Sequence, residues 1–130
     1  MAEAKRSDWK TLEMPERREP FPLEMDLTPE ELDRLRRGHT PEEMEDKWFL
    51  FFEDGVFYAC RSWTGYCIYR IPVSPEGAIR GGTVNRDPDQ YRETDPGRDG
   101  VMAEYLVSRQ AGRPGVKDLM IRYIRWGKEK

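Results

Sequence analysis

The spacing of hydrophobic positions changes at Trp48 from a helical period to the period of two that is typical of a β-strand. Asp54-Gly55 interrupts the apolar run over residues 48–61, and this dipeptide favours the type I′ turn of a two-residue hairpin. Such a short loop fixes the strand register, so Trp48 is expected to lie opposite Arg61. The segment is therefore predicted to form a β-hairpin of defined register.

Both faces of this predicted hairpin are apolar. One face carries Trp48, Leu50, Phe52, Phe57, Ala59 and Arg61, and the other carries Phe49, Phe51, Val56, Tyr58 and Cys60. An antiparallel sheet with a core on one side normally has one wet face. The pattern therefore predicts a second cover, for which the N-terminal segment, a curled sheet, a partner protein and a ligand all remain open.

Two more strands are expected after the hairpin. The third, over about residues 66–73, follows a turn at residues 62–65, and the fourth covers about residues 78–85. Gly81-Gly82 interrupts the fourth strand and indicates a bulge or a bend. The polar stretch over residues 85–99 follows, and a loop of this length is often functional.

Two helix starts have the same design, Thr28-Pro29-Glu30-Glu31 and Thr40-Pro41-Glu42-Glu43. Thr is the N-cap, Pro occupies the first helical position, and the third helical residue is a Glu that can bond back to the cap amide. The first helix is predicted over about residues 29–37 and ends at Gly38. The second is predicted to have only one or two turns, because strand character begins at Trp48.

Two further helices are predicted at the C-terminal end. Asp99 is expected to cap a helix that ends at Gly112. A second helix follows, with apolar residues at positions i, i+3, i+4, i+7 and i+8 from Val116 to Ile124. Together these elements predict an α+β fold, an antiparallel β-meander of three to five strands with helices packed on it. Residues 28–130 are expected to form a single domain, and residues 1–27 an extended, flexible arm.

Charge and composition narrow the functional classes. The net charge is −3, from 22 basic and 25 acidic residues, so general nucleic-acid binding is not indicated. No apolar run has the length of a signal peptide core or a membrane span, which predicts a cytoplasmic protein that does not bind a membrane. Cys60 and Cys67 are interpreted as small buried hydrophobes rather than a disulfide. With a lone histidine and no metal-ligand spacing, neither a metal nor a cofactor is expected.

The predicted turn over residues 61–66 is the first candidate site. It brings together a guanidinium, two hydroxyls, an indole and a phenol, which belong to Arg61, Ser62, Thr64, Trp63 and Tyr66. Aromatic rings stack on a nucleobase, and Arg binds phosphate through two parallel hydrogen bonds. The alternative is structural, with Trp63 capping the core and Arg61 resting on Trp48 as a cation–π pair.

The loop after the fourth strand is the second candidate. Asn85 and Arg86 are further candidate ligand-binding residues, and Asp87 is a candidate acid or base, although Asn85 and Asp87 can equally form Asx turns. His39 is the residue whose ordinary pKa is closest to neutrality, which makes it the candidate general base. A lone histidine in a loop is more often structural. The sequence contains no GxSxG, P-loop, GxGxxG or HExxH motif.

Three strings in the chain resemble a family of small bacterial proteins. They are MEDKWF at residues 44–49, RSWTGYCIY at residues 61–69 and VNRDP at residues 84–88. The resemblance covers about residues 28–110 and implies ADP-ribosylation or ADP-ribosyl-glycohydrolase chemistry. ADP-ribosyl-glycohydrolases of the dinitrogen-reductase type are larger, helical and have paired metal-binding aspartates, and this chain departs from them in each respect.

The leading functional hypothesis is a domain that binds a nucleotide-type small molecule such as ADP-ribose, with hydrolysis as a further step. Trp63 and Tyr66 would stack on the ligand, while Arg61 and Arg86 would hold phosphate. The alternative is a protein-interaction module, either an immunity or antitoxin-like protein or a homodimer, that uses the aromatic face of the sheet.

Overall fold

A five-stranded antiparallel sheet forms the centre of the computed structural model, which describes residues 3–127. The strands lie in the order β1-β5-β4-β3-β2. Their bounds are β1 Arg18–Asp26, β2 Trp48–Glu53, β3 Val56–Arg61, β4 Cys67–Pro72 and β5 Ala78–Asn85. Strands β2 to β5 follow one another as a meander, which confirms the predicted α+β fold and its antiparallel sheet.

The β2–β3 hairpin has the register that its two-residue loop predicted. Trp48 lies opposite Arg61, and the intervening pairs follow without a shift. Asp54 and Gly55 both have positive φ angles, 52° and 77°, as a type I′ turn requires. The local turn chemistry is therefore sufficient to set the pairing of these two strands.

Strand β1 lies within residues 1–27, the segment that the sequence predicted as an arm. It pairs along β5 at one edge of the sheet, and its side chains alternate between exposed and buried positions. Phe21, Leu23 and Met25 face the core. Pro20 and Pro22 are compatible with this strand because an edge position leaves every second N–H without a ladder partner. The pairing shifts between Phe21 and Glu24, opposite the predicted irregularity at Gly81-Gly82.

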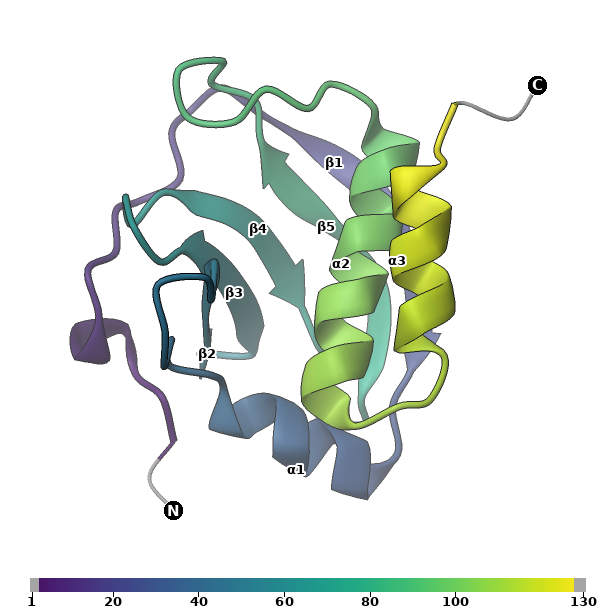
Figure 1. The fold of residues 1–130 in the computed structure, drawn as a ribbon. Helices are drawn as coiled ribbons and strands as arrows, with labels where there is room; N and C mark the ends of the chain where they lie inside the picture. The colour runs from purple at the N-terminus through teal and green to yellow at the C-terminus, as the bar shows by residue number, and fades with distance from the viewer. Residues whose placement is uncertain (1–2, 128–130) are drawn as a thin grey trace.

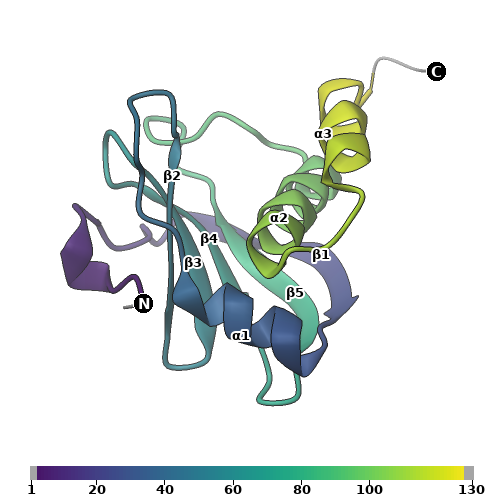
Figure 2. The same ribbon diagram turned by 60° about the horizontal axis from the view of Figure 1, so that its bottom comes forward.

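Three α-helices and one short 3₁₀ helix accompany the sheet in the described residues. They are η1 Arg6–Asp8, α1 Pro29–Arg37, α2 Pro96–Ala111 and α3 Val116–Ile124. Figures 1 and 2 show α2 lying across one face of the sheet, with α3 on the outer side of α2 and α1 near one end of the strands. The capping box of α1 is present, with hydrogen bonds between Thr28 and Glu31 of 2.9 and 3.2 Å.

The second predicted helix, from Thr40, is wrong. Residues 40–47 contain only a turn, because the chain must enter β2 almost at once. His39 pairs with Leu50 through two backbone hydrogen bonds of 2.8 and 2.9 Å. This close approach requires a glycine at position 38, where a Cβ would lie 2.3 Å from the Leu50 carbonyl oxygen and φ is +68°.

The predicted cap of α2 is also wrong. The helix begins four residues earlier than expected, and Asp95 is its N-cap, accepting a hydrogen bond from the Gly97 amide at 2.9 Å. Asp99 lies inside the helix and is fully buried. Its acidic side chain therefore has a role in the interior of the protein.

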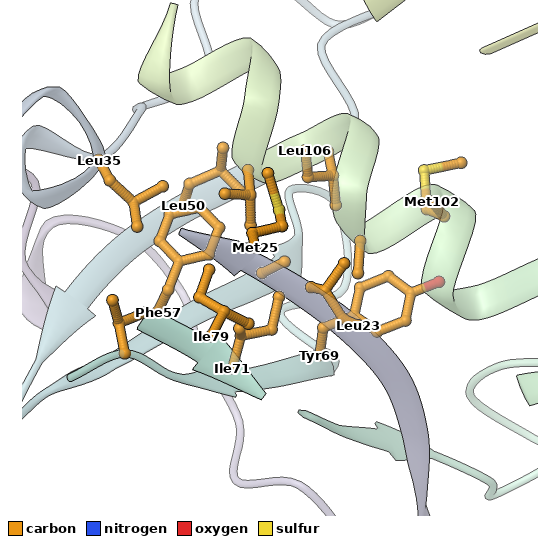
Figure 3. Close-up of a cluster of buried hydrophobic side chains, with 14 of the residues drawn as sticks. Leu23, Met25, Leu35, Leu50, Phe57, Tyr69, Ile71, Ile79, Met102 and Leu106 are labelled. Atoms are coloured by element: carbon orange, nitrogen blue, oxygen red, sulfur yellow. The ribbon is translucent and has the colours of Figure 1, made fainter. Parts of the chain in front are cut away.

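Two hydrophobic cores lie on the two faces of the sheet. The larger one fills the space between the sheet and helices α1 and α2, where Leu35, Leu50, Phe57, Tyr69 and Leu106 meet (Figure 3). The smaller one is covered by the N-terminal segment, and it consists of Ala4, Met14, Phe49, Phe51, Cys60 and Cys67. Both faces of the hairpin are thus covered, and the chain's own N-terminal segment is the second cover (Figures 1 and 2).

No helix within the described part of the chain combines the length and the apolar character that crossing a membrane requires.

Candidate functional site

A hollow of about 340 Å³ lies beside the turn that connects β3 and β4. Eight residues line it: Met44, Lys47, Arg61, Ser62, Trp63, Thr64, Tyr66 and Gln90. All five of the ligand-binding residues predicted within residues 61–66 are among them. Met44 and Lys47 come from the loop before β2, and Gln90 comes from the loop after β5.

Hydrogen bonds to the chain before β2 fix the turn over residues 61–66. The Ser62 hydroxyl donates to the Asp46 carbonyl at 2.7 Å, and the Ser62 amide donates to the Lys47 carbonyl at 2.9 Å. The Arg61 amide donates to the Tyr66 carbonyl at 2.9 Å and closes the turn. The side chains around the hollow are therefore held on a rigid frame before any ligand binds.

Trp63 is not part of the core. Its side chain is among the most exposed large hydrophobics, with 69% of the residue surface accessible, and only its indole N–H is engaged, donating to the Met44 carbonyl at 2.9 Å. This bond orients the ring while its surface stays in solvent. An exposed, oriented indole is suited to stacking on a flat ligand.

Arg61 forms the cation–π contact considered for it in the sequence. Its guanidinium carbon lies 4.4 Å from the ring centroid of Trp48 and 5.9 Å from that of Tyr91. Within residues 3–127 the Arg61 side chain makes no ion pair, and none of the eight lining residues is acidic. Arg61 and Lys47 therefore leave the hollow with a positive charge that an anionic ligand can neutralise.

Asn85 supports the hollow from behind without lining it. Its amide nitrogen donates to Gln90 Oε1 at 2.8 Å and to the Cys67 carbonyl at 3.0 Å, and its oxygen accepts from the Asp87 amide at 2.8 Å. The Asx turn is thus present, and the buried Asn85 side chain positions Gln90. Gln90 was missed in the sequence, where nothing distinguishes it from the other polar residues of its loop.

Arg86 lies outside the hollow and is held by the protein itself. Its guanidinium donates to Glu19 and Asp99 at 2.5 Å each and to the Glu93 carbonyl at 2.9 Å. Asp99 also accepts hydrogen bonds from the hydroxyls of Tyr69 and Tyr91. Burial raises the pKa of the Asp99 carboxyl, although its bonds with Arg86 act in the opposite direction. These contacts join α2 to the sheet and engage each of the three guanidinium nitrogens of Arg86 with the protein itself.

His39 and Asp87 do not line this hollow either. His39 borders a neighbouring hollow of about 510 Å³, where its Nε2 lies 2.5 Å from Asp46 Oδ2. Lys47 borders both hollows. Asp87 accepts a hydrogen bond from the Asp89 amide at 3.0 Å, as an Asx turn does. The structure therefore brings together the five binding candidates of residues 61–66, and leaves Asn85, Arg86 and the two catalytic candidates outside the hollow.

Among residues 3–127, no group of three or more His, Cys, Asp or Glu side chains is arranged to hold a metal ion.

The chain matches no known protein family, no curated protein and no solved structure.

Proposed function

We propose that this protein binds a small anionic ligand of the nucleotide type in the hollow beside residues 61–66. The observation that carries the proposal is the convergence there of an exposed, oriented indole with two cationic side chains. Trp63 and Tyr66 would sandwich or flank the base, and Arg61 and Lys47 would bind phosphate. The hydroxyls of Ser62 and Thr64 and the amide of Gln90 would supply further hydrogen bonds.

The size of the hollow favours a single nucleotide unit. Ligand pockets measure about 300–1,000 Å³, and at about 340 Å³ this hollow is near the lower end. A larger ligand such as ADP-ribose would place one part in the hollow and extend from it. ADP-ribose belongs among the ligands to be tested because the expected resemblance of residues 61–69 implies that chemistry, although no family model matches the chain.

Binding without turnover is the function that the geometry supports best. His39 and Asp87, the predicted acid and base, border other parts of the surface. The alternative function, a protein-interaction module, assumed that a partner protein covers the second apolar face of the sheet. That face is covered by Ala4, Trp9 and Met14, so its apolar character no longer favours a partner protein.

A thermal-shift series against AMP, ADP, ADP-ribose and NAD tests the proposal. A ligand at about 100 times its Kd adds roughly 2.7 kcal/mol to the free energy of unfolding, so the melting temperature of the wild type should rise. Trp63→Ala should abolish that rise. Because Trp63 is 69% exposed, the ligand-free variant should lose no more than about 0.5 kcal/mol.

Trp126→Ala is the matched control, since this indole lies away from the hollow and bonds with Asp95. It should retain the full ligand response. The proposal fails if no nucleotide stabilises the wild type, or if Trp63→Ala binds as tightly as the wild type in a calorimetric titration. A large loss of stability in ligand-free Trp63→Ala would show that the ring serves the fold.

A further inference from the structure

Two free cysteines lie at the two ends of the turn over residues 61–66. Cys60 is in β3 and Cys67 begins β4, and the two are partners in the antiparallel register. Both are buried, and both belong to the smaller core on the second face of the sheet. Their side chains therefore point to the same side of neighbouring strands.

This placement matches the geometry of a disulfide. Opposed residues in an antiparallel pair have Cα atoms about 4.5–5.5 Å apart, and disulfides join Cα atoms about 4.4–6.8 Å apart. Cys60 and Cys67 are Cα partners at the point where the β3–β4 register shifts, immediately after Ala59, and this pairing is compatible with a bond between them. This bond would join the two ends of the turn that carries Arg61, Trp63 and Tyr66.

The two thiols are chemically unequal. Contact with Cys60 lowers the pKa of Cys67, the positive charges of Arg70, Arg6 and Arg18 act in the same direction, and burial acts in the opposite direction. The same contact, together with burial, raises the pKa of Cys60. Arg70 Nε is buried and has no hydrogen-bond partner within the described residues, so part of this guanidinium is not engaged by the protein. Cys67 is therefore the thiol with the greater thiolate character, and the thiolate is the nucleophile in disulfide exchange.

The N-terminal segment packs against the small core that contains both cysteines. Trp9 packs over this core, and its ring lies 6.2 Å from that of Phe49. Its indole N–H donates to the Ser62 carbonyl at 2.7 Å, and the Leu12 amide donates to the Gly65 carbonyl at 2.8 Å. Access to the thiols requires this segment to move away from the turn.

We propose that Cys60 and Cys67 are a redox-active pair that forms a reversible intramolecular disulfide, with a low-molecular-weight disulfide such as oxidised glutathione as the oxidant. The Cys67 thiolate attacks one sulfur of glutathione disulfide, the glutathione S–S bond breaks, and one glutathione thiolate leaves. Cys60 then loses its proton to solvent and attacks the Cys67 sulfur, which releases the second glutathione thiolate. The protein gives up two electrons, and glutathione disulfide accepts them.

The test is a redox titration of the full chain in buffers of reduced and oxidised glutathione. The protein is quenched with acid, unfolded, alkylated with N-ethylmaleimide and weighed by mass spectrometry. Reduced protein should carry two labels, and oxidised protein should carry none and be lighter by two hydrogen atoms. Two labels at every buffer ratio, a stable glutathione adduct on the wild type, or a covalent dimer would each overturn the proposal. Ligand binding plays no part in this measurement, so its outcome is independent of the proposed function.

Single serine variants test the order of the two steps. In Cys60→Ser the second thiol is missing, so a glutathione adduct on Cys67 should accumulate. In Cys67→Ser the Cys60 thiol should remain free under the same conditions. Equal adduct formation in the two variants would overturn the assignment of Cys67 as the attacking thiol.

Opening of the N-terminal segment is tested by rate. Trp9→Ala removes the ring that covers this core, and disulfide formation should become several-fold faster than in the wild type. Trp126→Ala removes an indole that bonds with Asp95 and lies outside this core, so the rate should not change. Equal rates in Trp9→Ala and the wild type would contradict the requirement for opening.

Discussion

Asp99 has a different structural role from the one that its sequence context predicts. An Asp before an apolar helical pattern is a good N-cap candidate, yet Asp95 takes that place and Asp99 is fully buried. Its carboxylate accepts hydrogen bonds from Arg86, Tyr69 and Tyr91. Because Asp99 lies in α2 and its partners come from β4 and the loop after β5, this one side chain connects the helix layer to the sheet.

Asp99→Ala should destabilise the fold strongly. The substitution leaves the Arg86 guanidinium, whose side chain is 11% exposed, with Glu19 as its remaining carboxylate partner. Removing one partner of a buried ion pair costs about 3–5 kcal/mol. Chemical denaturation of the variant and the wild type measures the difference in the free energy of unfolding.

Asp89→Ala is the matched control, because Asp89 is an exposed acid in the loop that precedes α2. Its cost should stay within about 0.5 kcal/mol. Similar losses of stability in the two variants would show that the Asp99 contacts contribute nothing specific.

At the scale of elements, an ion pair ties α1 to the connection between α2 and α3. Arg113 donates to both carboxylate oxygens of Glu31, at 2.9 and 3.2 Å, and also to the Asp26 carbonyl. The hydrogen bond with Arg113 lowers the pKa of Glu31, and the bond from the Thr28 amide adds to the effect. The folded protein therefore holds a proton on Glu31 less tightly than the unfolded chain does.

This lowered pKa predicts the sign of a pH effect. The stabilisation is fully present at a pH above the usual Glu value of 4.5 and is lost as the pH falls through the folded-state pKa. Glu31→Gln keeps the capping-box acceptor and removes the charge. At pH 7 the variant should be less stable by at most about 1 kcal/mol, because solvent screens the pair. Urea denaturation measures the free energy of unfolding of both proteins from roughly pH 2 to pH 7, a range that spans the titration of a Glu. The difference between the variant and the wild type should vanish at the acid end.

Glu30→Gln serves as the control, since Glu30 occupies the same helical turn and forms no ion pair within the described residues. Its stability difference should be smaller at every pH. A Glu31→Gln difference that persists undiminished in acid would contradict an electrostatic origin.

At the scale of the whole molecule, the N-terminal segment completes the fold by covering the second face of the sheet. It packs on Phe49, Phe51 and both cysteines. It is anchored by the Arg6–Glu53 ion pair at 2.9 Å and by backbone bonds from Ala4 and Leu12. Without it, the hairpin would present a continuous apolar surface to water.

Deleting residues 1–13 should therefore cause self-association, because an exposed apolar patch of this kind promotes protein contacts. Light scattering after gel filtration should show dimers or larger species, and the protein should bind a hydrophobic dye. Leu12→Ser should leave the oligomeric state unchanged, because Leu12 is already 43% exposed. A truncated protein with the mass and melting temperature of the full chain would contradict this role.

Particular residues show where prediction from sequence was sufficient. Asp54-Gly55 set the register of β2 and β3, and Thr28 with Glu31 set the start of α1, because both signals act between near neighbours. The identical signal at Thr40 failed, since His39 is bonded to Leu50 and no room remains for a helix. The alternation of Phe21, Leu23 and Met25 marks β1, but Pro20 and Pro22 on either side of Phe21 made the segment resemble an irregular arm.

The candidate site also contains residues that a local sequence pattern identifies and residues that only tertiary packing brings in. Residues 61–66 are contiguous, so a local pattern could identify them, and their side chains do meet around one hollow. Lys47 and Gln90 reach the hollow only because two other loops pack beside the turn. Arg86 does not line the hollow, because its guanidinium donates hydrogen bonds to Glu19 and Asp99. Contacts between distant segments carry no local signature, because they depend on how the layers pack. For the same reason the hydrophobic pattern could show that the hairpin needs two covers, while only the folded chain shows that its own N-terminal segment is the second.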